Sequence, residues 1–217
     1  MQSYVITVAR GFGSGGKAIA DALAKELGIS CYENQILSLA SQMSGLDQEL
    51  FEEVNERIRD NKFSRLLKGI PKTIRPDPVH NEFVSDKRLF EFQKQIIMDL
   101  ASSESCIIVG KCADWILRDY DNVISIYIEA PREYCVKRVI EKMEVSEDTA
   151  HRSIASTDKY RANYYQHYTG GNYWTNPVNY DLTFNSGRID DEKIICLLKT
   201  YINLKFSTNT NEEDDNE

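Results

Sequence analysis

Four glycines and a lysine near the amino terminus form the segment best suited to chemistry. Gly11, Gly13, Gly15 and Gly16 lie close together, and Lys17 follows them directly. Glycines let a backbone turn tightly so that its N–H groups point at one spot, and a helix that begins there adds the positive end of its dipole. The lysine adds a positive charge on a long, flexible stem. This combination is typical of a site that binds the phosphate groups of a ligand.

The same segment fits two phosphate-binding patterns. Gly11, Gly13 and Gly16 fit G-x-G-x-x-G, the loop of dinucleotide-binding folds, and Glu33 lies 20 residues after Gly13, where those folds carry an acid for the ribose. Residues 11–17 also fit G-x-x-x-x-G-K, the P-loop, whose lysine reaches the β- and γ-phosphates. The position of the lysine favours the P-loop, and so does the long helix-rich segment that follows the second predicted strand.

Strands and helices that could hold this loop alternate along the chain, which indicates an α/β fold with a mainly parallel sheet. Apolar runs rich in β-branched residues predict the strands, and periodic apolar positions bounded by stop signals predict the helices. The predicted strands are residues 3–9, 29–32, 106–110, 123–129 and 181–185. The predicted helices are residues 17–27, much of 33–102, 132–143, two in succession across 146–167, and 190–204.

Length and charge limit the classes of function. The 217 residues suit one domain, predicted at 1–206, followed by an acidic, disordered tail at 207–217. The net charge of -8 falls largely on that tail, so the body is mildly acidic and a poor binder of nucleic acid. No apolar run is long enough to span a membrane, and no signal peptide is evident. The scattered cysteines predict reduced thiols in a cytoplasmic protein.

Several segments together resemble the bacterial cytidylate kinase-like proteins, a branch of the nucleoside monophosphate kinases. They are ITVARGFGSGGK at 6–17, ISCYEN at 29–34, IIVGKCAD at 107–114, APREY at 130–134 with KR at 137–138, TDKYRANYY at 157–165 and NYDLTFN at 179–185. The resemblance implies a three-layer P-loop kinase fold with a five-stranded parallel sheet in the order 2-3-1-4-5. It also implies a helical acceptor-binding insert at about 33–102 and a lid at 144–172.

The implied activity is ATP-dependent phosphoryl transfer, with magnesium, to CMP, dCMP or a related small phosphate acceptor. Lys17 and the lid arginines, Arg152 and Arg161, are then the catalytic cations. Candidates for the acceptor side are Glu33, Lys111 for the acceptor phosphate, Asp158 for orienting Arg161 or reading an amino group, and Asp181 for the sugar or base. The expected donor cradle comprises Arg10, Gly11, Phe12, Gly13, Ser14, Gly15, Gly16, Lys17 and Ala18.

Three positions depart from the pattern of related kinases. Ala18 and Ile19 stand where Ser or Thr would hold magnesium, and Val109 stands where cytidylate kinases carry Asp. We therefore expect the metal to be held by phosphates and water, with help from Ser14 or Asp114, and we expect position 19 to face the donor phosphates. Two other hypotheses stay open: a P-loop nucleotide-binding protein without catalysis, and a dinucleotide-dependent oxidoreductase.

Overall fold

A computed structural model describes residues 3–36, 40 and 81–206; for 81–88 it gives the course of the helix only. Most of the predicted insert and the predicted tail lie outside the described residues. The strands are β1 (Val5–Arg10), β2 (Ser30–Tyr32), β3 (Cys106–Val109), β4 (Val123–Glu129) and β5 (Leu182–Asn185). The helices are α1 (Gly16–Leu27), α5 (Asn81–Ser103), α6 (Ala113–Ile116), α7 (Arg132–Met143), α8 (Glu147–Tyr168), the short 3-10 helix η2 (Pro177–Asn179) and α9 (Asp191–Phe206).

The five strands form one parallel sheet in the order β2-β3-β1-β4-β5, as predicted. The central strand β1 pairs with β3 and β4, so that Val5 lies opposite both Cys106 and Val123. A dinucleotide-binding fold would place the second strand beside the first. Here β3 lies between β1 and β2, so the sheet has the order of a P-loop kinase and the dinucleotide-binding fold is excluded.

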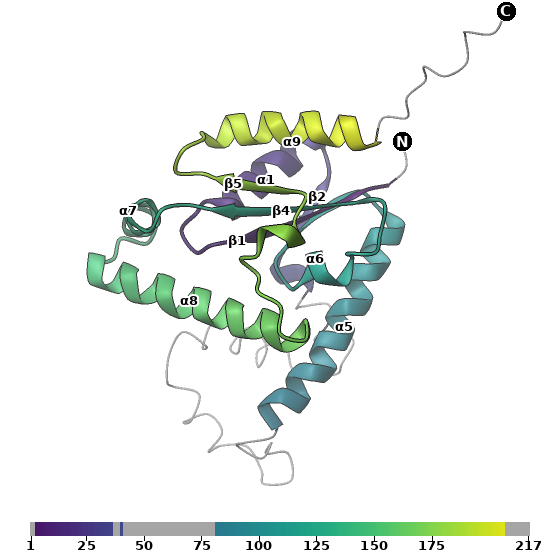
Figure 1. The fold of residues 1–217 in the computed structure, drawn as a ribbon, viewed down its shortest axis with the longest axis horizontal. Helices are drawn as coiled ribbons and strands as arrows, with labels where there is room; N and C mark the ends of the chain where they lie inside the picture. Colours follow the sequence, from purple (N-terminus) through teal and green to yellow (C-terminus); the bar gives the residue numbers. More distant parts are fainter. Residues whose placement is uncertain (1–2, 37–39, 41–80, 207–217) are drawn as a thin grey trace, which may run out of the picture.

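Helices cover both faces of this sheet, with α1 and α9 on one face and α5, α6 and α8 on the other (Figure 1). Successive strand residues point to opposite faces, so each strand contributes to both cores. Ile6 and Val8 of β1 pack in the core beneath α1 and α9, whereas Val5 packs with the α5 side. Both cores are built mainly from Ile, Leu and Val that are almost wholly buried. The sheet is therefore a rigid platform from whose carboxyl edge the glycine loop leaves.

Helix α8 is one continuous helix of 22 residues, and our prediction of two successive helices was wrong. Ser146 caps its start by accepting a hydrogen bond from the Thr149 N–H group at 3.3 Å. The first helix-breaking residue after that cap is Gly170, which follows the last turn and has a φ of 69°. The sequence between them is polar but contains neither Pro nor Gly. The polar residues of this segment lie on the exposed face of one helix and do not mark a boundary between two helices.

Two other features concern the sequence-based expectations. A short helix that we did not predict, α6, begins a few residues after β3 ends.

All five cysteines are free; Cys106, Cys112 and Cys135 are buried, as predicted for core thiols, whereas Cys31 is half-buried and Cys196 is exposed. In the part of the chain that the structure describes, no helix is long and apolar enough to cross a membrane.

Candidate nucleotide-binding site

The glycine loop between β1 and α1 has a shape that side chains would prevent. Gly13 and Gly15 have φ angles of 88° and 87°, in the left-handed region that favours glycine. A Cβ atom at Gly13 would lie 2.8 Å from the Cys135 carbonyl oxygen, and one at Gly15 would lie 2.8 Å from the Arg138 guanidinium carbon. Helix α7, which carries both neighbours, therefore packs directly against the loop.

The serine of the loop holds the loop together. Ser14 is fully buried, and its hydroxyl donates a hydrogen bond to the Gly11 carbonyl at 2.9 Å while it accepts one from the Gly16 N–H group at 3.4 Å. The Ser186 hydroxyl, from the segment after β5, donates to the Ser14 carbonyl at 2.5 Å. The Ser14 side chain is thus a brace inside the loop, and the loop is fixed from both ends of the chain.

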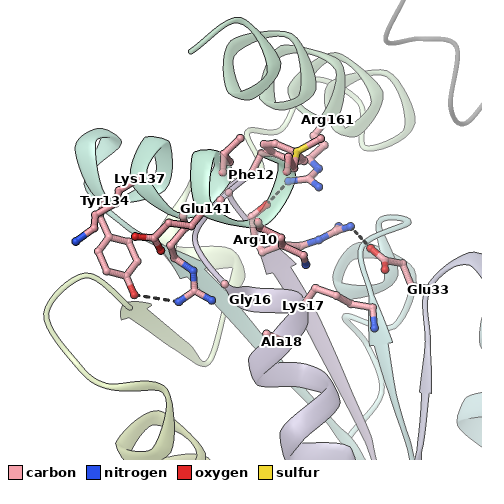
Figure 2. Close-up of a pocket in the computed structure, with 17 residues that line it drawn as sticks. Arg10, Phe12, Gly16, Lys17, Ala18, Glu33, Tyr134, Lys137, Glu141 and Arg161 are labelled. Atoms are coloured by element: carbon pink, nitrogen blue, oxygen red, sulfur yellow. Dashed lines mark hydrogen bonds and ion pairs between the residues drawn. The ribbon is translucent and has the colours of Figure 1, made fainter. Parts of the chain in front are cut away.

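An open pocket of about 860 Å³ lies beside this loop, between α1, α7 and Arg161 of α8 (Figure 2). Cationic side chains outnumber acids on its wall, although the whole chain carries a net charge of -8. The cations are Arg10, Lys17, Lys137, Arg138, Lys142 and Arg161, and the acids are Glu33 and Glu141. A cationic concave surface of this kind, next to a tight glycine-rich turn at the start of a helix, attracts a polyanionic ligand such as a nucleoside triphosphate.

Helix α7 contributes a wall that sequence reasoning largely missed. The Arg138 side chain lies against Gly15, donates a hydrogen bond to the Tyr134 hydroxyl at 3.0 Å and is 3.6 Å from the Asp191 carboxylate. Lys142 lies one turn further along the same pocket. The signal that could have found these residues is the spacing 134, 138 and 142, because residues four apart share one face of a helix.

Two of the predicted residues are held by local partners. Lys17 forms an ion pair with Asp21, one turn further along α1. On the same side of the pocket, Arg10 Nη2 lies 2.5 Å from Glu33 Oε1 (Figure 2). Burial lowers the pKa of Arg10, and the Glu33 carboxylate opposes that effect. The two acids hold these cations in place around the loop.

Arg161 reaches the start of the glycine loop from α8. Its Nη1 donates a hydrogen bond to the Arg10 carbonyl at 3.0 Å, and its guanidinium lies 5.7 Å from the centre of the Phe12 ring. Asp158 lies one turn before it, and its Oδ1 accepts a hydrogen bond from the Phe12 N–H group at 2.9 Å. The structure therefore brings Asp158 and Arg161 to the two residues on either side of Gly11, where β1 ends and the glycine loop begins.

Lys111 lies just beyond β3, close to Arg10 and outside the wall of the pocket. Gly110, Lys111 and Cys112 all have positive φ angles, of 74°, 61° and 54°, and such strain in non-glycine residues is commonest at functional sites. Burial, and then the positive charge of Arg10, lowers the pKa of Lys111 to about 8. Lys111, Arg10 and Arg161 thus form a group of cations that a bound anion would stabilise.

A model of the cytidylate kinase-like family matches residues 5–188, which is most of the chain. The chain belongs to this family. It is similar to cytidylate kinase from Saccharolobus islandicus, with 28% identity over 198 residues that cover 88% of this chain and 87% of the relative.

Two solved structures are also similar. An uncharacterized protein from Eubacterium ventriosum has a TM-score of 0.67 and 26% identity, covering 93% of this chain and 99% of its own. A gluconokinase from Sinorhizobium meliloti has a TM-score of 0.53 and 15% identity, covering 95% and 97%. The second likeness bears on the fold alone.

Two residues that the sequence suggested for the site lie away from the pocket. Arg152 is exposed and pairs with Asp148 at 3.0 Å. It precedes Arg161 by nine residues, so on a continuous helix of 3.6 residues per turn the two arginines point to opposite sides. Asp181 lies before β5, at the amino end of the strand, where it accepts a hydrogen bond from the Ser125 N–H group at 2.7 Å. The glycine loop is at the opposite end of the sheet, so neither residue reaches the pocket.

The side chains around the loop do not fit a protein-held magnesium site. Ala18 lines the pocket without a ligating atom, and Ile19 is fully buried in the core beneath α1. Our expectation that position 19 faces the donor phosphates was therefore wrong. Asp114 is buried and accepts a hydrogen bond from the Tyr165 hydroxyl at 2.6 Å. Among the described residues, no group of three or more His, Cys, Asp or Glu side chains could hold a metal ion.

Proposed function

We propose that the protein transfers the γ-phosphoryl group of ATP to a nucleoside monophosphate, with CMP or dCMP as the acceptor. The observation that carries this proposal is the ring of cations around a glycine loop whose shape excludes side chains. Phosphoryl transfer demands little covalent work from the protein, and such an arrangement supplies the positioning and the charge that it does demand. Membership of the cytidylate kinase-like family supports the choice of acceptor.

Each part of the site has a role in this proposal. Backbone N–H groups of the glycine loop hold the donor phosphates, and Lys17 exchanges Asp21 for a phosphate oxygen. Arg138 contacts the donor from the α7 side. Arg161 neutralises charge on the phosphoryl group as it moves, and Lys111 with Arg10 holds the acceptor phosphate. No step is assigned to a metal held by protein side chains.

A second candidate acceptor is a hydroxyl group on a small anion, and Glu33 favours it. The Glu33 carboxylate lies in the pocket beside Arg10 and is within electrostatic reach of Lys17. A phosphate acceptor has an oxygen ready to attack and is repelled by a carboxylate, whereas a hydroxyl acceptor needs a base to take its proton. In this version Glu33 is the base, and the cations bind the anionic group of the acceptor.

ADP release, measured by a coupled assay, distinguishes the two. The acceptors to compare are CMP, dCMP, UMP, AMP and hydroxy acids of similar size. We expect turnover with CMP or dCMP that Lys17→Ala abolishes and that Lys25→Ala, on the exposed face of the same helix, leaves intact. Turnover confined to a hydroxy acid, and lost in Glu33→Gln, would establish the second candidate. A wild-type rate in Lys17→Ala would exclude both.

A further inference from the structure

Two backbone groups of the glycine loop are bound by side chains from α8. The Phe12 N–H group donates to Asp158, and the Arg10 carbonyl accepts from Arg161, at 2.9 Å and 3.0 Å. These contacts join residues that are 146 and 151 positions apart in the chain. Helix α8 therefore holds the chain at the start of the glycine loop, on either side of Gly11.

Asp158 is the common partner in this contact. Its Oδ1 accepts the Phe12 N–H group and also lies 3.5 Å from Arg161 Nη1. Arg161 and Phe12 line the pocket, whereas Asp158 is absent from the pocket wall. Burial raises the pKa of Asp158, while the Phe12 hydrogen bond and the Arg161 charge oppose that rise. The carboxylate thus faces the loop and the arginine, not the space that a substrate would fill.

The segment of α8 that carries Asp158 is anchored on either side. Towards its start, Ala150 and Ile154 are buried against α7, in a core to which the Phe12 ring also belongs. Towards its end, the Tyr165 hydroxyl donates to the buried Asp114 carboxylate at 2.6 Å. Because a continuous helix links the two anchors, Asp158 has a fixed height above the loop.

We propose that Asp158 is a positioning residue, which locks the Phe12 peptide and the Arg161 guanidinium into one frame before nucleotides bind. This inference rests on the proposed function for its catalytic consequence. Without the carboxylate, Arg161 loses its tether, and the first turn of the loop loses the acceptor of its N–H group. Both changes displace groups that must meet the transferring phosphoryl group, and a misplacement of about 1 Å can cost ~10²-fold in rate.

Amide hydrogen exchange, measured by NMR, tests the contact without any activity. We expect the Phe12 amide to be protected in the wild-type protein and to exchange at least about tenfold faster in Asp158→Ala. Asp148→Ala is the matched control, because Asp148 also pairs with an arginine of α8 but touches no loop atom. Equal exchange of the Phe12 amide in the wild type and Asp158→Ala would overturn the inference.

Steady-state kinetics test the consequence for the reaction. We expect Asp158→Ala to lower kcat by roughly 10- to 100-fold with both KM values changed by less than about threefold, the signature of an interaction needed in the transition state. Asp158→Asn should recover part of the rate, since its amide oxygen still accepts the Phe12 N–H group. In an Arg161→Ala background, Asp158→Ala should lower kcat by a smaller factor than in the wild type, because the part of its effect that acts through Arg161 is already lost.

The two proposals fail in different ways. A large rise in the acceptor KM at unchanged kcat would make Asp158 a substrate contact and overturn its positioning role. Absence of transfer by the wild-type protein to every acceptor would remove the proposed function, and the exchange experiment would still decide whether Asp158 holds the loop.

Discussion

The Arg10–Glu33 ion pair joins two strands that do not touch in the sheet. Arg10 ends β1 and Glu33 follows β2, and β3 runs between these strands. The pair therefore bridges the end of β3, directly where Gly110 and Lys111 begin the next segment. A Cβ atom at Gly110 would lie 2.3 Å from Arg10 Nη1, so the bridge passes close to this glycine. One ion pair thus fixes the ends of β1 and β2 across the end of β3, beside the pocket.

The first prediction concerns the stability that this pair provides. Both side chains are largely shielded, with 15% and 21% exposure, so removal of the acid leaves a cation with little water around it. We expect Glu33→Ala to lower the free energy of unfolding by about 1–3 kcal/mol. Urea denaturation measures this. Glu26→Ala, which breaks the exposed pair with Lys199, should cost less than about 1 kcal/mol. Similar losses in the two variants would contradict the prediction.

The second prediction concerns pH and Lys111. Its pKa is about 8 in the folded protein, below the ordinary 10.5, so the side chain loses its charge as the pH rises through about 8. The acceptor KM should therefore increase above that pH, and Lys111→Arg should move the increase to higher pH. Measurement of KM from pH 6.5 to 9.5 in both forms decides this. An unchanged pH profile in Lys111→Arg would exclude Lys111 from acceptor binding.

The same titration has a consequence for folding. Between pH 8 and 10.5 the unfolded chain holds the Lys111 proton more often than the folded chain does. Stability rises with pH wherever the unfolded state binds more protons. Burial of the charged lysine disfavours the folded state, and this penalty decreases as the side chain loses its proton across that window. The difference in unfolding free energy between the wild type and Lys111→Met should depend on pH there. A constant difference would show that Lys111 titrates normally.

The third prediction separates the two arginines of α8. We expect Arg161→Ala to lower kcat by about 10³-fold, as removal of a cation from the transferring group does. Arg152→Ala should change kcat by less than about threefold, because Arg152 is exposed on the other side of the helix. Single-turnover rates at saturating nucleotide provide the comparison. Equal effects would mean that α8 rotates or moves during the reaction.

The fourth prediction concerns the two apolar positions that follow Lys17. Ala18 lines the pocket, so Ala18→Ser adds a hydroxyl beside the donor phosphates and should lower the free magnesium concentration needed for half-maximal rate. Ile19 is fully buried, so Ile19→Thr should leave that concentration unchanged and lower stability by about 1–3 kcal/mol. Magnesium titrations and thermal denaturation separate these outcomes. A shift in the magnesium requirement of Ile19→Thr would contradict the placement of that side chain.

The sequence was informative where local rules act and misleading where distant segments meet. Glycine spacing and Lys17 predicted the loop, and the alternation of strands and helices predicted a parallel α/β sheet, because each depends on short stretches of chain. The order of the strands came from the resemblance to the cytidylate kinase-like family. The contacts of Asp181 with Ser125 could not be predicted, since they join segments that meet only in the folded sheet. Arg152 was misplaced because a break was predicted inside α8; one continuous helix puts its side chain on the opposite side from Arg161.

Because the Ser186 hydroxyl donates a hydrogen bond to the Ser14 carbonyl, the conformation of the glycine loop depends on two segments that are far apart in the sequence. A peptide covering β1, the loop and α1 would carry the whole motif, yet it would lack the residue that holds the floor of the loop from beneath. Transferring these residues to another protein would therefore transfer the sequence of the motif without its conformation. Truncation of the chain before β5 should abolish nucleotide binding even though every residue that faces the pocket would still be present.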